Sequence, residues 1–323
     1  MVLDIAYACN NNFVQQTIIS MMSLLENHRM YTVVLYLIED RVQDSYIKMI
    51  KSLAEQYDRQ LEIVSLDALL KNLQCSLSLE NDRHPYTIYA KLFLDQICNS
   101  DRILYLDSDT VVTGSLRQLW EMDMRNTYIA GVRMPYTYAE KKRLGLGRKD
   151  IYVCDGVLLI HLKKWREDNF QKRCVDYIRN QKGRLPMLSE GVVNYIARRH
   201  VGVLHPRYNL MSGMILWTGS QLVQLYGTED AYYSDQEIED ARNNPVIIHY
   251  LNELYIRPWF GNSDHPYKHE YLYYRAKAGY NDRLPFGSLK TRTCILRLLN
   301  ALLPFTLFRS IYGLVKRRNE KLK

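Results

Sequence analysis

The stretch Arg102–Thr110 constrains the fold of this chain more than any other segment. Four consecutive apolar residues, Ile103 to Leu106, predict a buried strand that is too short to be a helix. Two carboxylates one residue apart, Asp107 and Asp109, come directly after it. Because ligands of open α/β sheets bind at the carboxyl ends of the strands, this pair can hold a divalent cation and leave positions open for phosphate oxygens. For an isolated pair the alternative is a turn that ends the strand and caps the next helix.

The segments before this stretch alternate between two periodicities. Apolar runs at Leu3–Ala8, Tyr31–Ile38 and Leu61–Leu66 predict strands, and the i, i+3, i+4 spacing in Val14–Leu25 and Gln43–Tyr57 predicts helices between them. Strands and helices that alternate with short connections predict a parallel sheet of the nucleotide-binding kind. Further expected elements are a helix over Tyr86–Ile97, a strand over Tyr128–Val132, a mobile loop with some helix over Tyr138–Asp150, a strand over Gly156–Leu162, one long helix over Lys163–Gln181, a helix over Ser189–Arg199 capped by Ser189, and a strand over Val246–His249.

Composition places the chain among ordinary globular proteins. Its 323 residues are 47% hydrophobic and 24% charged, which suits one large domain with a sizeable core. The six cysteines show no paired close spacing, so the sequence indicates neither a zinc site nor a disulfide framework. Reduced thiols and the lack of a signal-peptide pattern predict a cytoplasmic protein.

The net charge of +8 is concentrated in the C-terminal segment. Nine of the 43 Lys and Arg residues and one of the 35 acidic residues lie between Lys290 and Lys323, so residues 1–289 carry 34 of each and are neutral. A neutral body argues against nucleic acid as a partner. The longest charge-free run in this segment, Leu298–Phe308, has 11 residues and contains Pro304, whereas a membrane span needs about 20. We therefore expect residues 290–323 to form a basic amphipathic helical tail on an anionic membrane surface; the alternative is a helix packed on the body or on a second subunit.

Six motifs in a fixed order carry a resemblance to a known family. They are the turn Ala8–Phe13 after the first strand, Tyr89–Leu92, Leu106–Asp109 followed by Leu116–Trp120, the run Val153–Trp165, Arg207–Asn209, and His249 followed by Arg257–Pro258–Trp259. Together they resemble the family 8 glycosyltransferases of the glycogenin and bacterial galactosyltransferase type, within the bacterial branch that builds surface polysaccharides. The resemblance runs from about Leu3 to about Trp259.

The resemblance implies a fold and an activity. The fold would be a single GT-A-type, Rossmann-like α/β domain over residues 1–289 with a mostly parallel central sheet. The activity would be a metal-dependent, retaining transfer of a hexose, galactose or glucose, from a UDP-sugar to a saccharide or lipid-linked acceptor. The enzyme would work in the cytoplasm, peripherally on the inner face of the cell membrane.

The resemblance also implies a metal site and a site for the leaving group. Asp107 and Asp109 would hold Mn²⁺ or Mg²⁺ with His249 as the third protein ligand, and a histidine in an oxygen shell favours Mn²⁺. Arg257 would add a fixed positive charge on the leaving phosphate. Lys91 would neutralise a phosphate or hydrogen-bond the sugar. The alternatives are a core histidine for His249 and a solvated helix residue for Lys91.

The donor nucleoside would bind along the first turn. Ala8 and Asn10 would lie at the nucleobase, Asn12 and Ser108 would hydrogen-bond the base and ribose, and Phe13 would offer a stacking face or be plain core. Asn10 and the following Asn11 replace carboxylates that the family has there, so base recognition would be adjusted.

Two carboxylates are expected at the reacting carbon. Glu190 stands where the family has glutamine, and as a carboxylate it would act as nucleophile or stabilise an oxocarbenium-like transition state. Asp155 stands where alanine is usual and would lie near the donor hydroxyls, unless it is only an acidic turn. The acceptor would bind between the variable loops Tyr138–Asp150 and Gly213–Asp230.

Two other classes of protein remain open. The run Asp107–Val111 after an apolar strand also fits the first motif of haloacid-dehalogenase-type phosphatases, although that fold normally begins at this motif. The departures at the site also fit a membrane-associated sugar-nucleotide-binding protein that has lost catalysis. Hydrolysis of the donor without an acceptor separates an enzyme from a pure binder.

Overall fold

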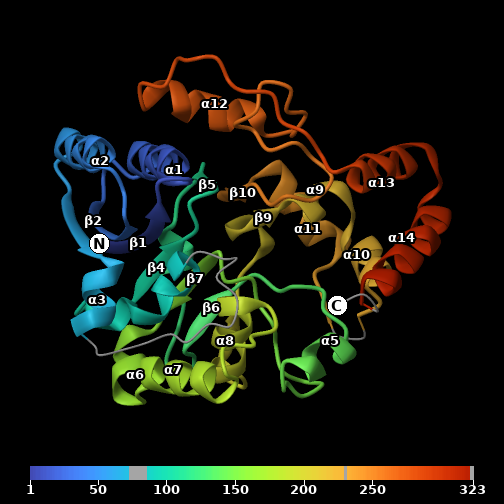
Figure 1. Cartoon of the computed structure of the whole chain (residues 1–323), viewed down its shortest axis with the longest axis horizontal. Coiled ribbons are helices and arrows are strands. Elements are labelled where there is room, and N and C mark those ends of the chain that lie inside the picture. Colours follow the sequence, from blue (N-terminus) through green and yellow to red (C-terminus); the bar gives the residue numbers. More distant parts are fainter. Residues whose placement is uncertain (73–85, 229–230, 321–323) are drawn as a thin grey trace.

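The computed structural model describes residues 1–72, 86–228 and 231–320 (Figure 1). The strands are β1 (Val2–Asn10), β2 (Thr32–Asp40), β3 (Gln60–Ser65), β4 (Ile103–Leu106), β5 (Thr110–Val112), β6 (Ile129–Gly131), β7 (Val157–Ile160), β8 (Val201–Val203), β9 (Leu210–Met211) and β10 (Ile247–His249). The α-helices are α1 (Val14–Asn27), α2 (Asp44–Gln56), α3 (Leu66–Asn72), α4 (Arg117–Trp120), α5 (Tyr138–Arg143), α6 (Leu162–Glu167), α7 (Phe170–Asn180), α8 (Leu188–Ala197), α9 (Ser212–Leu216), α10 (Gly219–Tyr226), α11 (Asp235–Asn243), α12 (Lys268–Lys277), α13 (Thr291–Leu302) and α14 (Phe305–Glu320), and two 3₁₀ helices are η1 (Tyr86–Gln96) and η2 (Pro206–Tyr208).

A seven-stranded sheet forms the centre of the molecule. Its strand order is β3-β2-β1-β4-β7-β6-β8, and β7 runs antiparallel to both of its neighbours while the other pairs are parallel. This confirms the predicted α/β class with a mostly parallel sheet. A small second sheet, β5-β10-β9, begins directly after Asp109 and brings His249 beside Thr110.

Alternate residues of the strands enter two separate cores. Along β1, Leu3, Ile5 and Tyr7 face a core built with α1, whereas Ala6 and Ala8 face a second core built with η1 and α6 to α8. Figure 1 shows α1 and α2 on one side of the sheet and α6 and α7 on the other. Because each fully buried Leu or Ile side chain contributes about 1.5–3 kcal/mol, burial on both faces fixes the strand register.

Two local predictions were wrong, and a third element differs in helix type. The helix expected over Lys163–Gln181 is two helices, α6 and α7, because the backbone at Asn169 turns left-handed with φ of 51° and ends the first helix. The helix expected over Tyr86–Ile97 is present as η1, but it is a 3₁₀ helix and is buried on nearly all sides. Ser189 lies inside α8 instead of capping it.

The C-terminal segment forms α13 and α14, which meet at Pro304. Phe308 is fully buried and its ring stacks on Trp217 at 6.0 Å, and Trp217 Nε1 donates a hydrogen bond to Asn300. Other apolar side chains of the two helices face solvent, namely Ile295, Leu298, Leu302 and Leu307. Among the described residues, no helix combines the length and apolar character that crossing a bilayer demands.

Candidate active site

The carboxyl ends of β1 and β4 form the edge where the predicted site residues gather. β1 and β4 pair in parallel, with Ile5 opposite Leu104 and Ala6 opposite Tyr105, so the turn after Asn10 and the carboxylates after Leu106 leave the sheet at the same edge. The backbone N–H of Asp107 donates to Gly156 O at 2.7 Å, which ties this edge to β7 as well. The sheet therefore fixes the Asp-x-Asp backbone from both sides.

Asp107, Asp109 and His249 come together although 140 positions separate Asp109 from His249 in the sequence. One ligand atom from each lies within 4.8 Å of the others. His249 Nε2 is 3.0 Å from Asp109 Oδ1 and 4.0 Å from Asp107 Oδ2. On the other side of the ring, Asn209 Oδ1 accepts from Nδ1 at 3.0 Å, so Nε2 is the nitrogen directed at the carboxylates.

The space around these three residues fits a cation. A Cβ on Gly156 would lie 2.3 Å from His249 Cε1 and 2.8 Å from Asp107 Oδ2, so only glycine leaves room there. Burial lowers the pKa of His249, but the Asp109 carboxylate outweighs burial and raises this pKa well above its usual range. Burial raises the pKa of Asp109, but His249 and Arg257 outweigh burial and lower it. Two carboxylate oxygens and one imidazole nitrogen form a donor set that suits a divalent metal ion.

Lys91 is buried beneath the carboxylates and does not face open solvent. Its side chain is 2% exposed, and Nζ lies 2.9 Å from Asp155 Oδ2 and 3.5 Å from Asp107 Oδ1. Nζ also donates to the backbone carbonyl of Asp155 and lies 4.4 Å above the Tyr105 ring. Burial lowers the pKa of Lys91, but Asp107 and Asp155 outweigh it and raise this pKa well above its usual range. Lys91 therefore holds two carboxylates in place as a buried cation.

Asp155 and Glu190 form a second pair of carboxyl groups next to the first. Ser189 Oγ donates to Asp155 Oδ2 at 2.8 Å, and the backbone N–H of Asp155 lies 3.4 Å from Glu190 Oε2. Tyr152 donates its hydroxyl proton to Glu190 Oε1 at 2.8 Å. Burial, with the neighbouring Asp155 carboxylate, raises the pKa of Glu190 to about 8.

An unusual backbone conformation at the start of α8 positions Glu190 next to Asp155. Met187 and Leu188, which are not glycines, have φ of 61° and 52°, a costly conformation that the surroundings must impose. A Cβ on Gly191 would lie 2.2 Å from Pro186 O, so this position needs glycine. Asn194 then pins the helix, since its amide accepts from the N–H of Val153 and donates to the Val153 carbonyl, both at 2.9 Å.

The turn after β1 is preorganised by its own asparagines. Asn10 Oδ1 accepts from the N–H of Asn12 at 3.0 Å, and the carbonyl of Asn10 accepts from the N–H of Phe13. Asn12 is exposed and Phe13 is half-buried. Ser108 Oγ lies 3.3 Å from the Ala8 carbonyl and 2.8 Å from Thr17 Oγ1.

Arg257 extends from the loop after β10 toward the cluster of Asp107, Asp109 and His249. Its Nη2 lies 3.6 Å from Asp109 Oδ2, and its guanidinium lies 5.0 Å above the Trp259 ring. Its Nε is buried and has no hydrogen-bond partner among the described residues. An unpaired buried donor beside a cation site can serve a phosphate oxygen.

The structure brings the predicted residues to one edge and adds four that were not predicted as site residues. Tyr105 donates to Asp107 Oδ1 at 2.8 Å, Tyr152 holds Glu190, Asn194 fixes α8 and Asn209 orients His249. Alternation along β4 places Tyr105 on the same side as Asp107, which was a usable signal. For Tyr152 and Asn194 the sequence analysis singled out no signal, because their partners Glu190 and Val153 are distant in the chain. Asn209 belongs to the motif Arg207–Asn209, but its contact with His249 depends on the fold.

The chain is similar in sequence to known proteins. A family model described as glycosyl transferase family 8 matches residues 4–263. General stress protein A of Bacillus subtilis (strain 168) is 20% identical over 87% of this chain and 95% of its own length. A lipopolysaccharide 1,2-glucosyltransferase of Escherichia coli is 24% identical over 79% of this chain and 73% of its own. Some relatives are longer; the chain spans 38% of Streptococcus pneumoniae glycosyltransferase GlyF.

The fold is similar to that of a solved enzyme. The galactosyltransferase LgtC, solved with donor and acceptor sugar analogs, superposes with a TM-score of 0.68 at 18% identity over 90% of this chain and 98% of that one. This likeness shows that the domain has the GT-A fold. Since the family model covers most of the chain, including every residue of the carboxylate edge, the chain belongs to glycosyl transferase family 8.

Proposed function

We propose that this protein is a metal-dependent, retaining hexosyltransferase that moves galactose or glucose from a UDP-sugar to a saccharide or lipid-linked acceptor in bacterial surface polysaccharide synthesis. The observation that carries the proposal is the convergence of Asp107, Asp109 and His249 within 4.8 Å at the carboxyl edge of the sheet. A bound Mn²⁺ or Mg²⁺ would neutralise the negative charge that develops on the departing UDP.

Residues of the chain would bind the leaving diphosphate, the nucleobase and the ribose. Arg257 would place its unpaired Nε and its charge at the leaving diphosphate. The turn Asn10–Phe13 would hold the nucleobase, and Ser108 with Ala8 would border the ribose. Lys91 acts through Asp107 and Asp155, since its side chain is 2% exposed and fully engaged by them.

Glu190 is the carboxyl group that we place at the reacting carbon. In its ionised form it would attack or stabilise the anomeric centre on the face opposite the leaving UDP, and the Tyr152 hydroxyl orients it. Asp155, fixed by Ser189 and Lys91, would bind a donor hydroxyl. Glu190→Gln is the test of this role, and turnover that is unchanged in the variant would remove Glu190 from the mechanism.

We further propose that α13 and α14 hold the enzyme on the inner face of the cell membrane. Their exposed Ile295, Leu298, Leu302 and Leu307 provide apolar area, and nine Lys and Arg residues between Lys290 and Lys323 suit anionic lipid. A protein of this kind would work from the cytoplasm.

A thermal-shift panel of sugar nucleotides, each with and without Mn²⁺, tests the proposed function. Ligands that bind the native state stabilise it by mass action, so the correct UDP-sugar should raise Tm only when Mn²⁺ is present. Slow hydrolysis of that donor without acceptor would show a competent enzyme. Donor binding without any hydrolysis would instead indicate a sugar-nucleotide-binding protein, and phosphatase turnover without sugar nucleotide would contradict the proposal.

A further inference from the structure

Three hydroxyl side chains of α1 face the segment that carries Asp107 and Asp109. Thr17, Ser20 and Ser23 are spaced three residues apart, so they are neighbours on the helix surface. All three are fully buried, and Figure 1 shows α1 next to β5, the strand that begins directly after Asp109. Because buried polar groups are hydrogen-bonded in native proteins, each of the three needs a partner. We refer to these three residues as the hydroxyl row.

The hydroxyl row is paired with alternate residues of the opposite segment. The pairs are Thr17 Oγ1 with Ser108 Oγ at 2.8 Å, Ser20 Oγ with Thr110 Oγ1 at 3.0 Å, and Ser23 Oγ with the N–H of Val112 at 2.9 Å. Ser108 stands between the two carboxylates in the sequence, whereas Thr110 and Val112 are the first and last residues of β5. The helix is therefore bonded to the metal-binding segment at three successive points.

The contact of Ser20 with Thr110 belongs to a chain of hydrogen bonds that runs in one direction. Thr110 donates its only hydroxyl proton to the backbone carbonyl of Asp107 at 2.8 Å, so it can only accept from Ser20. Since Ser20 gives its own proton to Thr110, it accepts in turn from the hydroxyl of Tyr7 at 3.2 Å. The chain begins at Tyr7 and ends on the carbonyl of Asp107.

The carbonyl at the end of this chain belongs to the peptide group that links Asp107 to Ser108. A peptide group is planar and rigid, so its rotation decides how the side chains of Asp107 and Asp109 are placed relative to each other. Backbone bonds hold the two ends of the segment. The N–H of Asp107 donates to Gly156 at 2.7 Å, and the carbonyl of Asp109 accepts from Tyr250 at 2.9 Å. The hydroxyl chain holds the peptide group between them.

We propose that Ser20 and Thr110 are positioning residues for the divalent metal ion. Through the Asp107 carbonyl, they hold the two carboxylates at the separation that the ion requires. Both side chains are buried, Ser20 fully and Thr110 to 1% exposure, so they act on the ligands and do not touch the ion. Groups that orient metal ligands in this way raise metal affinity. The inference rests on the proposed metal-dependent function and adds residues outside the set of ligands.

The test measures the Kd of Mn²⁺ on the full chain with saturating UDP, from the electron paramagnetic resonance signal of free Mn²⁺. Urea denaturation without metal gives the stability of each variant. Thr110→Val keeps the shape of the side chain and removes the hydroxyl, so the Kd should rise about tenfold or more. Thr110→Ser keeps the hydroxyl and should stay within about threefold of the wild-type value.

Ser20→Ala and Ser23→Ala are a matched pair on the helix. Each removes one fully buried hydroxyl, so the two variants should lose similar stability. Ser20→Ala should raise the Kd about threefold or more, less than Thr110→Val does, because Thr110 still reaches the Asp107 carbonyl but is no longer held itself. Ser23→Ala should change the Kd by less than about twofold, since its partner Val112 lies beyond the carboxylates.

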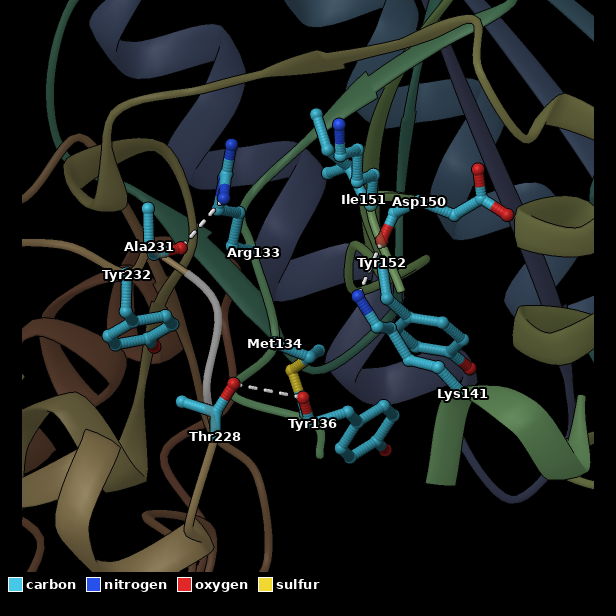
Figure 2. A pocket seen from close by; sticks show the side chains of 11 residues that line it. Arg133, Met134, Tyr136, Lys141, Asp150, Ile151, Tyr152, Thr228, Ala231 and Tyr232 are labelled. Atoms are coloured by element: carbon cyan, nitrogen blue, oxygen red, sulfur yellow. Dashed lines mark hydrogen bonds between the residues drawn. The ribbon is translucent and has the colours of Figure 1, made fainter. Parts of the chain in front are cut away.

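Tyr152→Phe controls for the loss of a hydroxyl elsewhere in the site. Figure 2 shows Tyr152 with Tyr136 on the wall of a separate cavity, and the Tyr152 hydroxyl donates to Glu190. This variant should slow transfer, because Glu190 loses the group that orients it. It should leave the Kd of Mn²⁺ within about twofold of wild type.

Three results would overturn the proposal. They are a Thr110→Val variant that binds Mn²⁺ as tightly as wild type, equal weakening in Thr110→Val and Thr110→Ser, and equal weakening in Ser20→Ala and Ser23→Ala. If Thr110→Val does not fold, the pair of serine variants decides. Any of these results, with a wild type that binds Mn²⁺ in the presence of UDP, would remove the positioning role and keep the proposed function. A wild type that binds no Mn²⁺ would overturn both.

Discussion

The edge of the sheet that carries Asp107, Asp109, Asp155 and Glu190, which we call the carboxylate edge, is held differently from the C-terminal helices α13 and α14. At the edge, Asp107 alone receives a hydroxyl from Tyr105, faces the ammonium of Lys91, and is tied by its backbone to Gly156. The described part of α13 and α14 is held by apolar packing and a few polar contacts. Leu296 and Phe308 are buried, and Phe308 and Tyr312 lie against Trp217. The polar contacts include the hydrogen bond from Trp217 to Asn300 and an ion pair between Arg297 and Asp264.

This difference indicates two kinds of task. A site that stabilises developing charge must be held rigidly before the substrate arrives, because reorganisation during the reaction costs rate. A segment that binds a surface can keep an apolar face exposed and be anchored at few points. Substitutions at the edge should therefore affect donor chemistry, and substitutions in α13 and α14 should affect attachment and docking.

Asp109→Asn should have the largest effect. It removes a charged ligand of the proposed cation and the partner of both His249 and Arg257, so transfer should fall by at least about 10³-fold, more than about 4 kcal/mol. Steady-state kinetics with a UDP-sugar, and loss of the Mn²⁺-dependent thermal shift, are the measurements. A variant that keeps both activity and thermal shift would show that this edge is not the donor site.

Lys91→Met should cost roughly 3 kcal/mol or more of unfolding free energy, because it leaves the buried carboxyl group of Asp155 and the half-buried one of Asp107 without their shared cation. Urea denaturation measures this loss. Adding Asp155→Asn should recover part of the stability, since one of the unpaired charges is then gone. If the double variant is no more stable than Lys91→Met, the stabilising role assigned to this ion pair is wrong.

Phe308→Ala should cost about 2–3 kcal/mol in the docking of α14, less than for a central core residue because the tail can detach locally. The measurement is amide hydrogen exchange, comparing the protection of α14 with that of the central strands. Leu307→Ala, at a side chain that is 55% exposed, is the neighbouring control and should change little. Equal exchange rates of α14 in the two variants would mean that Phe308 does not anchor the tail. Donor hydrolysis should be unaffected in both variants.

Glu190 should make stability fall as pH rises. Its pKa is about 8 in the folded protein and about 4.5 when unfolded, so between these values the folded state binds the extra proton and unfolding becomes easier at higher pH. The slope should approach about 1 kcal/mol per pH unit, allowing for its partial exposure. The groups that face Glu190 are Asp155, Tyr152, Tyr136 and Lys91.

Comparing wild type with Glu190→Gln in denaturation from pH 5 to 9 isolates this contribution. The difference in unfolding free energy between the two proteins should change steadily through this range. If the two stability curves stay parallel, the carboxyl group of Glu190 is not held neutral by its surroundings.

Leu298→Ser should have the smallest effect on the fold, within about 0.5 kcal/mol, because the side chain is 58% exposed. Binding to vesicles that contain anionic lipid should nevertheless weaken several-fold, since this side chain belongs to the proposed lipid-facing surface. Vesicle sedimentation at low and high salt measures it. Unchanged binding, or binding that does not respond to salt, would argue against membrane attachment through this surface.

Much of the site could be predicted because its chemistry is local in the sequence. The apolar run before Asp107 predicts a strand, and a strand in a parallel sheet places the residues after it at the carboxyl edge. The role of Lys91 could not be predicted in the same way. Its sequence position suggests a ligand-facing cation, but η1 buries it under two carboxylates that lie 16 and 64 residues further along the chain.

The sequence by itself determined the α/β class with a mostly parallel sheet, the Asp-x-Asp pair and the family, because periodicity and short motifs report what neighbouring residues do. Only the tertiary structure decided which distant groups contact one another. Asn209 forms a hydrogen bond with His249, Tyr152 forms one with Glu190, and Lys91 forms an ion pair with Asp155. These pairings depend on how helices and loops cross the ends of the sheet. The positions of these helices and loops depend on the packing of both hydrophobic cores together, and no single stretch of residues encodes that packing.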